Sequence, residues 1–320
     1  MTRVAAVDCG TNSIRLLIAD IDDAGTLTDV ERDMIVVRLG QGVDSTGQFA
    51  DEAIERTRVA LAGYVERMVV AGVEQVRMVA TSATRDASNR DEFFAMTAEL
   101  LGKVQAGAVA EVITGDEEAR LSFRGAVGGL DPADGPFVVT DLGGGSTEVV
   151  VGSVSRGEAV VAGAYSADIG CVRLTERALP SDPPTVDERA RAAEIAAQEL
   201  AKAFDAVDVS PARTWVGVAG TLTTFAAVHA GLDEYDPEVI HHSRIPLADL
   251  HVLCGRIVAM TRDERMSLGP MHPGRADVIG GGALVTRELA RQFADRAAIT
   301  EMVVSEHDIL DGIALGLATR

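Results

Sequence analysis

The chain has 320 residues, a length typical of two domains, and its 47% hydrophobic and 4% aromatic content indicates aliphatic cores. A formal charge of −20 at pH 7 repels nucleic acids and anionic membranes at long range, which argues against both as partners. A phosphate-rich ligand would therefore need a locally basic site, a bound cation, or both.

The three cysteines, Cys9, Cys171 and Cys254, are odd in number and too widely spaced for a zinc site or a disulfide framework. No apolar run approaches the roughly 18 residues of a membrane span, and Met1-Thr2-Arg3 leads directly into a strand pattern. These features predict a cytoplasmic protein in a reducing compartment. We expect Cys9 to be a small buried filler rather than a reactive thiol.

The first part of the chain alternates strand and helix patterns. Apolar runs and helical spacing predict strands at 4–7, 14–19, 27–37, 76–80 and 109–113, with helices at 51–71 and 89–101. Thr114-Gly115-Asp116-Glu117 then has the form of a capping box that opens another helix.

A linker at Asp131–Pro136 is followed by a second round of the same pattern. Strands are predicted at 137–140, 149–151, 159–164, 216–218 and 302–305, with a helix at 187–207 and a helical region at 247–291. Strands followed by βα units, twice over, predict two α/β lobes. We expect lobe I at 1–125, lobe II at 126–305, and a C-terminal helix at 306–320 that packs back on lobe I.

Two acidic, glycine-rich turns occur in matching strand–turn–strand contexts. They are Asp8-Cys9-Gly10-Thr11-Asn12-Ser13 and Asp141-Leu142-Gly143-Gly144-Gly145-Ser146-Thr147-Glu148. Glycines permit close approach of the backbone, exposed N–H groups and hydroxyls suit phosphate oxygens, and a carboxylate suits a hydrated cation. One such turn could simply close a hairpin. Two of them indicate a duplicated fold that holds one phosphorylated ligand between its halves.

Several motifs in family order make the chain resemble the exopolyphosphatase/guanosine-pentaphosphate phosphatase (Ppx/GppA) family of the actin, Hsp70 and sugar-kinase superfamily. Besides the two turns, they are Thr81-Ser82-Ala83-Thr84-Arg85, Ile113-x-Gly-x-Glu-Glu-Ala119, Ile169-Gly-Cys-Val172 and Ala219-Gly-Thr221. The resemblance implies an α/β fold of two actin-like (ribonuclease H-like) lobes with a cleft between them. It implies no extra C-terminal helical domains, because the chain stops at residue 320.

The resemblance assigns Glu118 as the general base that activates the attacking water. Hydrolysis of a phosphoanhydride needs such a carboxylate and charge compensation for the transferring group. Glutamate in the first turn of a helix is also favoured by the helix dipole, and we expect that simpler role for Glu117. Asp141 and Glu148, joined by Asp8, resemble the ligands of Mg²⁺ or Mn²⁺, although an aspartate can also cap its own turn.

The same resemblance implies residues that contact phosphate. Arg85 would neutralise the phosphoryl group in the transition state, with a surface salt bridge as the alternative. The phosphate-binding candidates share turn or helix-start positions: Asn12, Ser13, Gly144, Gly145, Ser146, Thr147, Gly220 and Thr221. Arg275 is a weaker candidate for contact with a longer substrate.

One position departs from the family pattern. Leu310 stands where Asp-x-x-x-Arg-Glu-Gly has its arginine, so a positive charge near the far end of the cleft is expected to be missing. This leaves substrate length preference open.

The sequence as a whole predicts an exopolyphosphatase-like hydrolase that releases terminal orthophosphate from inorganic polyphosphate, guanosine pentaphosphate, or both. A homodimer is common among the relatives it resembles. The alternatives are a non-catalytic binder of polyphosphate or alarmones, and an ATP-dependent kinase on the same scaffold. The kinase would need a base pocket and an acceptor-activating aspartate, and neither is recognised in the sequence.

Overall fold

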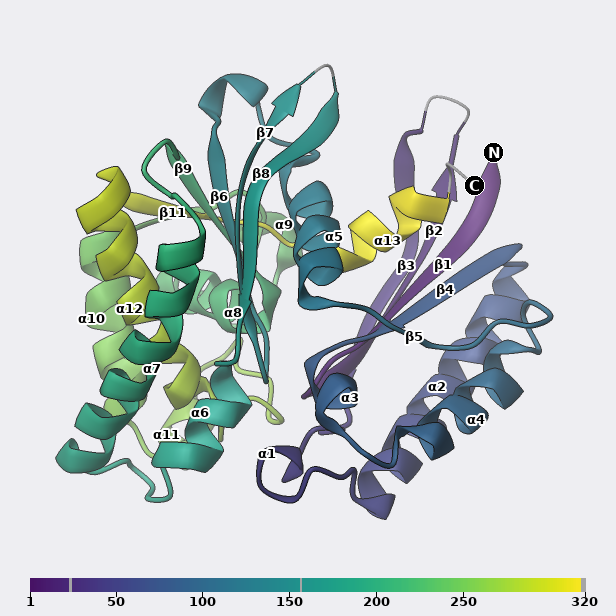
Figure 1. The fold of residues 1–320 in the computed structure, drawn as a ribbon, viewed down its shortest axis with the longest axis horizontal. Coiled ribbons are helices and arrows are strands. Elements are labelled where there is room, and N and C mark those ends of the chain that lie inside the picture. Colours follow the sequence, from purple (N-terminus) through teal and green to yellow (C-terminus); the bar gives the residue numbers. More distant parts are fainter. Residues whose placement is uncertain (23–24, 156, 318–320) are drawn as a thin grey trace. The chain divides into compact units, whose positions relative to one another are not determined.

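The computed structural model describes residues 1–22, 25–155 and 157–317, which form two compact units. The first unit contains Met1–Gly125 and the C-terminal helix, and the second contains Ala126–Asp308. Each unit has its own β-sheet and its own helices (Figure 1). Residues 318–320, the end of the predicted C-terminal helix, lie outside the described residues.

The sheet of the first unit has the strand order β3-β2-β1-β4-β5. The strands are β1 (Thr2–Cys9), β2 (Ser13–Ile21), β3 (Leu27–Val36), β4 (Gln75–Ala80) and β5 (Glu111–Val112). The first three strands form an antiparallel meander, whereas β4 and β5 run parallel to β1. β5 is shorter than the predicted 109–113, and the other four strands lie where the apolar runs predicted them.

The strand β1 is buried on both faces of this sheet. Because side chains alternate along a strand, Val7 and Cys9 belong to the core beneath α2 (Asp51–Ala71) and α4 (Arg90–Leu101). Val4 and Ala6 point to the opposite face and belong to a second core, which α13 (Ile309–Leu317) covers. The C-terminal helix therefore packs on the first sheet.

Three further helices of the first unit are α1 (Val43–Thr46), α3 (Ser82–Asp86) and α5 (Gly115–Val127). The capping pattern predicted the start of α5, and Thr114 Oγ1 accepts a hydrogen bond from the Glu117 N–H at 3.2 Å. The sequence analysis predicted neither α1 nor α3, because four or five residues are too few to display a helical period.

The sheet of the second unit has the strand order β10-β11-β9-β6-β7-β8. Its strands are β6 (Phe137–Leu142), β7 (Thr147–Ser155), β8 (Glu158–Ala167), β9 (Thr214–Val218), β10 (Arg244–Pro246) and β11 (Glu301–Val304). The strands β6, β7 and β8 form an antiparallel meander, and β9 and β11 run parallel to β6.

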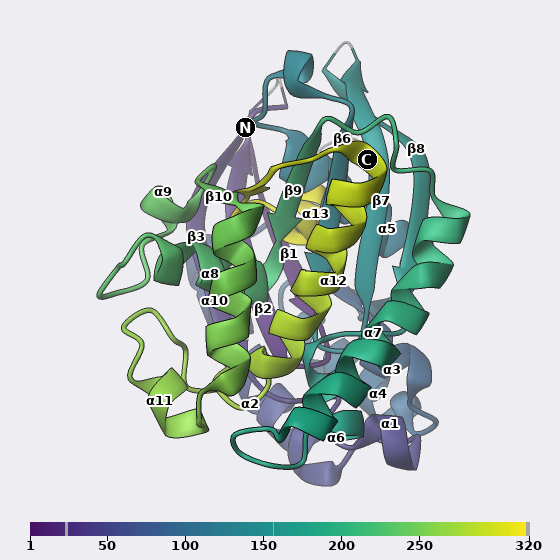
Figure 2. The same ribbon diagram turned by 90° about the vertical axis from the view of Figure 1, so that its left-hand side faces the viewer.

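Helices cover the second sheet, with α12 (Ile279–Ala297) between α7 (Val186–Ala206) and α10 (Leu247–Ala259) (Figure 2). The predicted helical region 247–291 is thus more than one helix. The remaining helices are η1 (Pro132–Asp134), α6 (Cys171–Ala178), α8 (Ala219–His229), α9 (Pro237–Ile240) and α11 (Arg262–Met266). Within the described part of the chain, no helix combines the length and hydropathy that a membrane span requires.

The two sheets share one topology. The order β3-β2-β1-β4-β5 of the first unit corresponds to β8-β7-β6-β9-β11 of the second, with the same parallel and antiparallel pairs. In each unit a glycine-rich turn joins the first two strands. The repeated sequence pattern therefore reflects a repeated fold, and the cleft expected between the lobes stays a prediction.

Candidate active site

The two glycine-rich turns have the same internal geometry. The Gly10 N–H donates to the Ser13 carbonyl at 3.0 Å, and the Gly143 N–H donates to the Ser146 carbonyl at 3.0 Å. The strand pairs that close the turns are also equivalent, since Cys9 faces Ile14 and Leu142 faces Thr147. Residues 8–15 and 141–148 can therefore be compared position by position.

Both turns hold hydrogen-bond donors that have no acceptor in the part of the chain that the structure describes. Among the described residues, no acceptor receives the backbone N–H groups of Thr11, Asn12, Gly144 or Gly145. The side chains of Asn12, Ser13 and Ser146 likewise have no hydrogen-bond partner in the described parts of the chain. Within each turn, clustered amides and hydroxyls without acceptors suit an anion.

The first turn is braced by the segment that leaves β3. The N–H groups of Val37 and Arg38 donate to the Asn12 carbonyl at 3.0 and 2.8 Å, and that of Gly40 donates to the Thr11 carbonyl at 2.8 Å. A Cβ atom on Gly40 would lie 2.4 Å from Thr11 Cγ2, so only glycine permits this approach. The brace leaves the amides of the turn free to face a ligand.

The second turn is braced by the start of α6. The N–H groups of Cys171 and Val172 donate to the carbonyls of Gly143 and Gly144 at 3.0 and 2.9 Å. The Thr147 hydroxyl donates to the Ile169 carbonyl at 2.6 Å and is fully buried. That bond engages the hydroxyl proton of Thr147 in the brace, and the phosphate contact of Thr147 stays a prediction.

The cross-strand pairs beside the turns differ in charge. In the first unit, Asp8 Oδ2 accepts hydrogen bonds from Arg15 Nε at 3.0 Å and Arg15 Nη2 at 2.7 Å. At the equivalent positions of the second unit, Asp141 faces Glu148, so two nearly buried carboxylates share one face of the sheet. Glu148 also accepts a hydrogen bond from the Ser166 hydroxyl at 2.7 Å.

This difference bears on the predicted metal ligands. Two adjacent buried carboxylates need compensating charge, and the Asp141–Glu148 pair offers the oxygen ligands that a divalent cation prefers. Asp8 already has a guanidinium partner. Within the described ranges, no group of three or more His, Cys, Asp or Glu side chains is arranged to hold a metal.

Glu118 and Arg85 form an ion pair within the first unit. Arg85 Nη1 lies 2.7 Å from Glu118 Oε2 and donates to the Ile113 carbonyl at 3.1 Å. Glu118 is only 7% exposed, in the first turn of α5. The contact unites two residues predicted for different roles, and it positions the Glu118 carboxylate.

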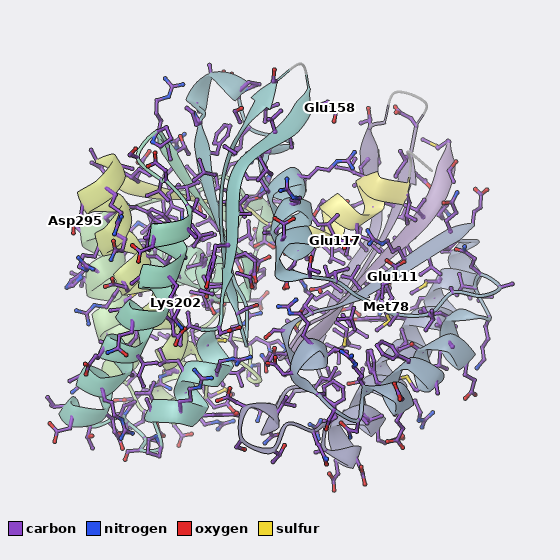
Figure 3. The ribbon with its side chains drawn as sticks, in the orientation of Figure 1. Met78, Glu111, Glu117, Glu158, Lys202 and Asp295 are labelled. Atoms are coloured by element: carbon purple, nitrogen blue, oxygen red, sulfur yellow. The ribbon has the colours of Figure 1, made fainter. Side chains whose placement is uncertain are left out.

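The neighbouring Glu117 has a different environment. Its carboxylate and that of Glu111 both bind Arg77, at 2.7 and 2.9 Å, and Figure 3 labels both glutamates. Because Arg77 is buried while Glu111 is exposed and Glu117 half-buried, these pairs satisfy a buried guanidinium. The expected structural role of Glu117 agrees with this geometry.

The start of α8 places a basic side chain beside the predicted anion site Gly220-Thr221. The guanidinium of Arg275 lies against Gly220, where a Cβ atom would be 2.0 Å from Arg275 Nη2. Arg275 Nη1 donates to Thr224 Oγ1 at 2.8 Å. Ala219, at the helix start, has a φ of 70°, a strained value for a residue with a side chain.

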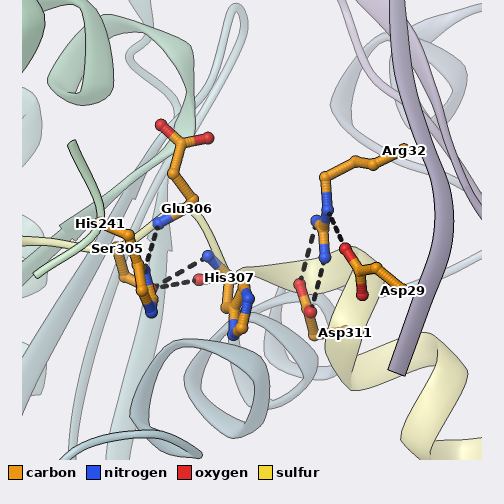
Figure 4. A network of polar contacts seen from close by, with 7 residues as sticks. All are labelled: Asp29, Arg32, His241, Ser305, Glu306, His307 and Asp311. Atoms are coloured by element: carbon orange, nitrogen blue, oxygen red, sulfur yellow. Dashed lines mark hydrogen bonds and ion pairs between the residues drawn. The ribbon is translucent and has the colours of Figure 1, made fainter. Parts of the chain in front are cut away.

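Burial explains why Cys9 is unreactive and why position 310 holds a leucine. Cys9 is 1% exposed, and burial together with the charge of Asp8 raises the pKa of its thiol, which makes it a poor nucleophile. Leu310 is 2% exposed and packs in the core between α13 and β1. Its neighbour Asp311 binds Arg32 through both carboxylate oxygens, at 2.7 and 3.2 Å (Figure 4).

Sequence reasoning missed two basic residues near the turns, Arg15 and Arg173. The N–H of Arg173 donates to the Gly144 carbonyl at 3.1 Å, which places this half-buried residue beside the second turn. Extension of the Ile169–Val172 motif by one residue would have found it. Arg15 could have been found by pairing it with Asp8 across the hairpin.

Comparison with known proteins supports the class that this site defines. The model of the Ppx/GppA phosphatase family matches residues 17–316. "Exopolyphosphatase 2" of Mycobacterium tuberculosis is 60% identical over 321 residues, covering 99% of each chain. The crystal structure of an exopolyphosphatase-like protein matches with a TM-score of 0.90 and 43% identity, over 99% of this chain and 97% of that chain.

A structural study of the Aquifex aeolicus PPX-GPPA enzyme provides a further match, with a TM-score of 0.78 and 32% identity, over 98% of this chain and 99% of that chain. The chain belongs to the Ppx/GppA phosphatase family. The predicted family and the predicted fold of two actin-like lobes are confirmed.

Proposed function

We propose that this protein releases terminal orthophosphate from inorganic polyphosphate, guanosine pentaphosphate, or both, by attack of water. Family membership and the 60% identical exopolyphosphatase support the underlying class, an exopolyphosphatase-like phosphoanhydride hydrolase. The choice between the two substrates belongs to the proposal, because both present the same terminal phosphate.

The observation that carries the proposal is the pair of equivalent, braced turns, in which the amides of Thr11, Asn12, Gly144 and Gly145 have no acceptor among the residues that the structure describes. Terminal phosphate oxygens are acceptors that these amides and the side chains of Asn12, Ser13 and Ser146 can bind. Gly144 and Gly145 contribute backbone N–H groups, and Gly220-Thr221 with Arg275 offers a second anion site. These donors, together called the cradle, orient the terminal group for in-line attack.

Glu118 accepts a proton from the attacking water in this proposal. Burial restricts its motion, and the ion pair with Arg85 fixes the direction of its carboxylate. Arg85 thereby acts as a positioning residue for Glu118, and the planar geometry of a guanidinium suits a phosphoryl oxygen. Positioning by a rigid partner is what general-base catalysis requires.

Asp141 and Glu148 would hold a divalent cation, Mg²⁺ or Mn²⁺, and their adjacent carboxylates fit it. When bound, the cation would supply charge neutralisation at the phosphate oxygens. Asp8 is the third ligand in this proposal, and its carboxylate also binds Arg15. The protein's own groups still provide the cradle and the base.

The test is phosphate release by a Glu118→Gln variant from tripolyphosphate, long polyphosphate and guanosine pentaphosphate, each with Mg²⁺ or Mn²⁺. Loss of the base should reduce kcat by about 10²- to 10⁴-fold. Substrate binding and the melting temperature should change little, because Gln keeps the shape and the hydrogen bond to Arg85.

A Glu117→Gln variant is the matched control, since it removes the same charge from the adjacent position, and its kcat should stay near the parent value. Near-normal kcat in the Glu118→Gln variant would refute the assigned base. Tight binding without phosphate release by the parent protein would instead support a non-catalytic binder, and formation of ADP from ATP would support a kinase.

A further inference from the structure

A groove lies between α7, α10 and α12 of the second unit. Figure 2 shows these three helices of the layer that covers the second sheet. It has a volume of about 540 Å³, within the range of roughly 300 to 1,000 Å³ that small-molecule sites occupy. Its lining residues recur at helical spacing on each helix, for example Leu284, Arg287 and Arg291 on α12. The groove is built from three helix faces of a single unit.

The floor of the groove is apolar, and its walls carry positive charge. Val258 of α10 and Leu284 of α12 are buried side chains that line it. Arg189 of α7 and Arg287 and Arg291 of α12 lie around them. The lining thus carries three guanidinium groups, although the chain as a whole has a net charge of −20.

The positive charges are only partly compensated. Glu288, the single acid in the lining, accepts hydrogen bonds from Arg291 at 2.6 and 2.9 Å. In the described ranges, Arg189 donates only to the Thr185 carbonyl, at 3.4 Å. The half-buried side chain of Arg287 has no hydrogen bond or ion pair among the described residues. Two guanidinium groups therefore lack a carboxylate partner.

Small residues keep the groove open. Gly255 lies inside α10, where a glycine is unfavourable by comparison with alanine. A Cβ atom at Gly255 would meet nothing within 4 Å, and the φ of this residue is not positive. Neither packing nor backbone geometry demands this glycine, and the space beside it is open to a ligand.

We propose that this groove binds a small amphiphilic anion, with a carboxylate or phosphate group on an apolar body. The anionic group would pair with Arg287 and Arg189, and the apolar body would cover Val258 and Leu284. The site is separate from the glycine-rich turns, and the proposal is independent of the proposed hydrolase function.

The first test uses 8-anilinonaphthalene-1-sulfonate, an anion with an aromatic body, as a fluorescent probe of the full chain. We expect saturable binding that an Arg287→Gln variant weakens by about tenfold, the effect of one lost charge-assisted contact. Arg256→Gln is the matched control, because Arg256 is exposed on α10 but does not line the groove. It should bind like the parent.

A second variant, Gly255→Leu, distinguishes loss of probe binding in the groove from loss of the fold. Its side chain should fill the groove and abolish probe binding without lowering the melting temperature. Competition with decanoate and with decyl phosphate then distinguishes a carboxylate ligand from a phosphate ester, and displacement by either supports the site.

Three results would overturn the proposal. Parent-like binding by both Arg287→Gln and Gly255→Leu would place the probe elsewhere. Displacement by tripolyphosphate would place it in the substrate site. Concentration-dependent dimerisation that Gly255→Leu abolishes, measured by light scattering, would identify the groove as an interface with a second copy.

Discussion

A single residue distinguishes the electrostatics of the two turns. Arg15 and Glu148 occupy equivalent positions, each across the sheet from an aspartate. With arginine the pair is neutral and braces the hairpin, whereas with glutamate two carboxylates lie side by side on one face of the sheet, a pair that a positive charge stabilises. The same backbone can therefore serve one function in each unit, a rigid phosphate turn in the first and a candidate cation site in the second.

The surroundings of His242 predict how the free energy of unfolding changes with pH. Its ring stacks on that of His241, with centroids 3.7 Å apart, and His241 in turn contacts His307 and accepts the N–H of Glu306 (Figure 4). Burial, followed by the charges of His307 and Arg244, lowers the pKa of His242. The imidazole of His242 therefore binds a proton less readily in the folded protein than in the unfolded chain, where it does so near a pH of roughly 6.5.

The direction of the pH effect on stability follows from proton uptake by the unfolded chain. Below about pH 6.5 the unfolded state binds the additional proton, so the free energy of unfolding falls as the pH decreases. A His242→Phe variant keeps the ring stack and should lose less stability between pH 7.5 and pH 5.5, as measured by urea unfolding. His229→Phe, at an exposed position, is the control. Equal losses in the parent and the His242→Phe variant would contradict the assignment.

At the scale of elements, the second turn depends on its contact with α6. A Cβ atom on Gly170 would lie 2.5 Å from the Gly144 carbonyl carbon and oxygen, and backbone cannot move aside as a flexible side chain can. Gly170→Ala should therefore destabilise the fold by about 1 to 3 kcal/mol. It should also reduce phosphate release in the surviving folded protein, because it displaces the amides of Gly144 and Gly145.

Gly63→Ala in α2 provides the matched comparison. Nothing lies within 4 Å of a Cβ atom at Gly63, so the substitution should stabilise the helix by about 0.5 to 1 kcal/mol and leave activity unchanged. Urea unfolding and phosphate release measured on both variants check the prediction. Similar effects at Gly63 and Gly170 would show that the contact with Gly144 is unimportant.

The sequence predicted the regular elements well because their signals are local. Periodic apolar positions gave α2 with its observed bounds, Asp51–Ala71, and the apolar run at 137–140 lies within β6. The short helices α3 and α6 were missed, although α3 carries Arg85 and α6 braces the second turn. Their conformations depend on contacts far away in the chain, which no local pattern records.

For the candidate site too, some features could be predicted from the sequence and others could not. The residue types and the turns could be identified from the sequence, but the partners could not. The Arg85–Glu118 pair spans 33 positions, and the bond that engages Thr147 spans 22. Both partners are set by tertiary packing, so sequence reasoning treated Arg85 and Thr147 as ligand contacts before their protein contacts were known.

At the scale of the whole molecule, the net charge of −20 opposes approach of a polyanion. The proposed substrate must therefore overcome long-range repulsion before the local cradle can bind it. Between ionic strengths of about 10 and 150 mM the Debye length falls from about 30 to 8 Å, which screens the distant charges more than contacts within the site.

We therefore expect kcat/KM for long polyphosphate to rise by about threefold over that range, with free Mg²⁺ held constant. The value of kcat should stay constant, because screening affects the encounter and leaves the bound geometry unchanged. Tripolyphosphate carries less charge and should respond less, which makes it the internal control. Initial rates of phosphate release measure both effects. A kcat/KM that falls with salt would mean that attraction by the basic residues of the site, such as Arg173 and Arg275, outweighs the repulsion of the surface.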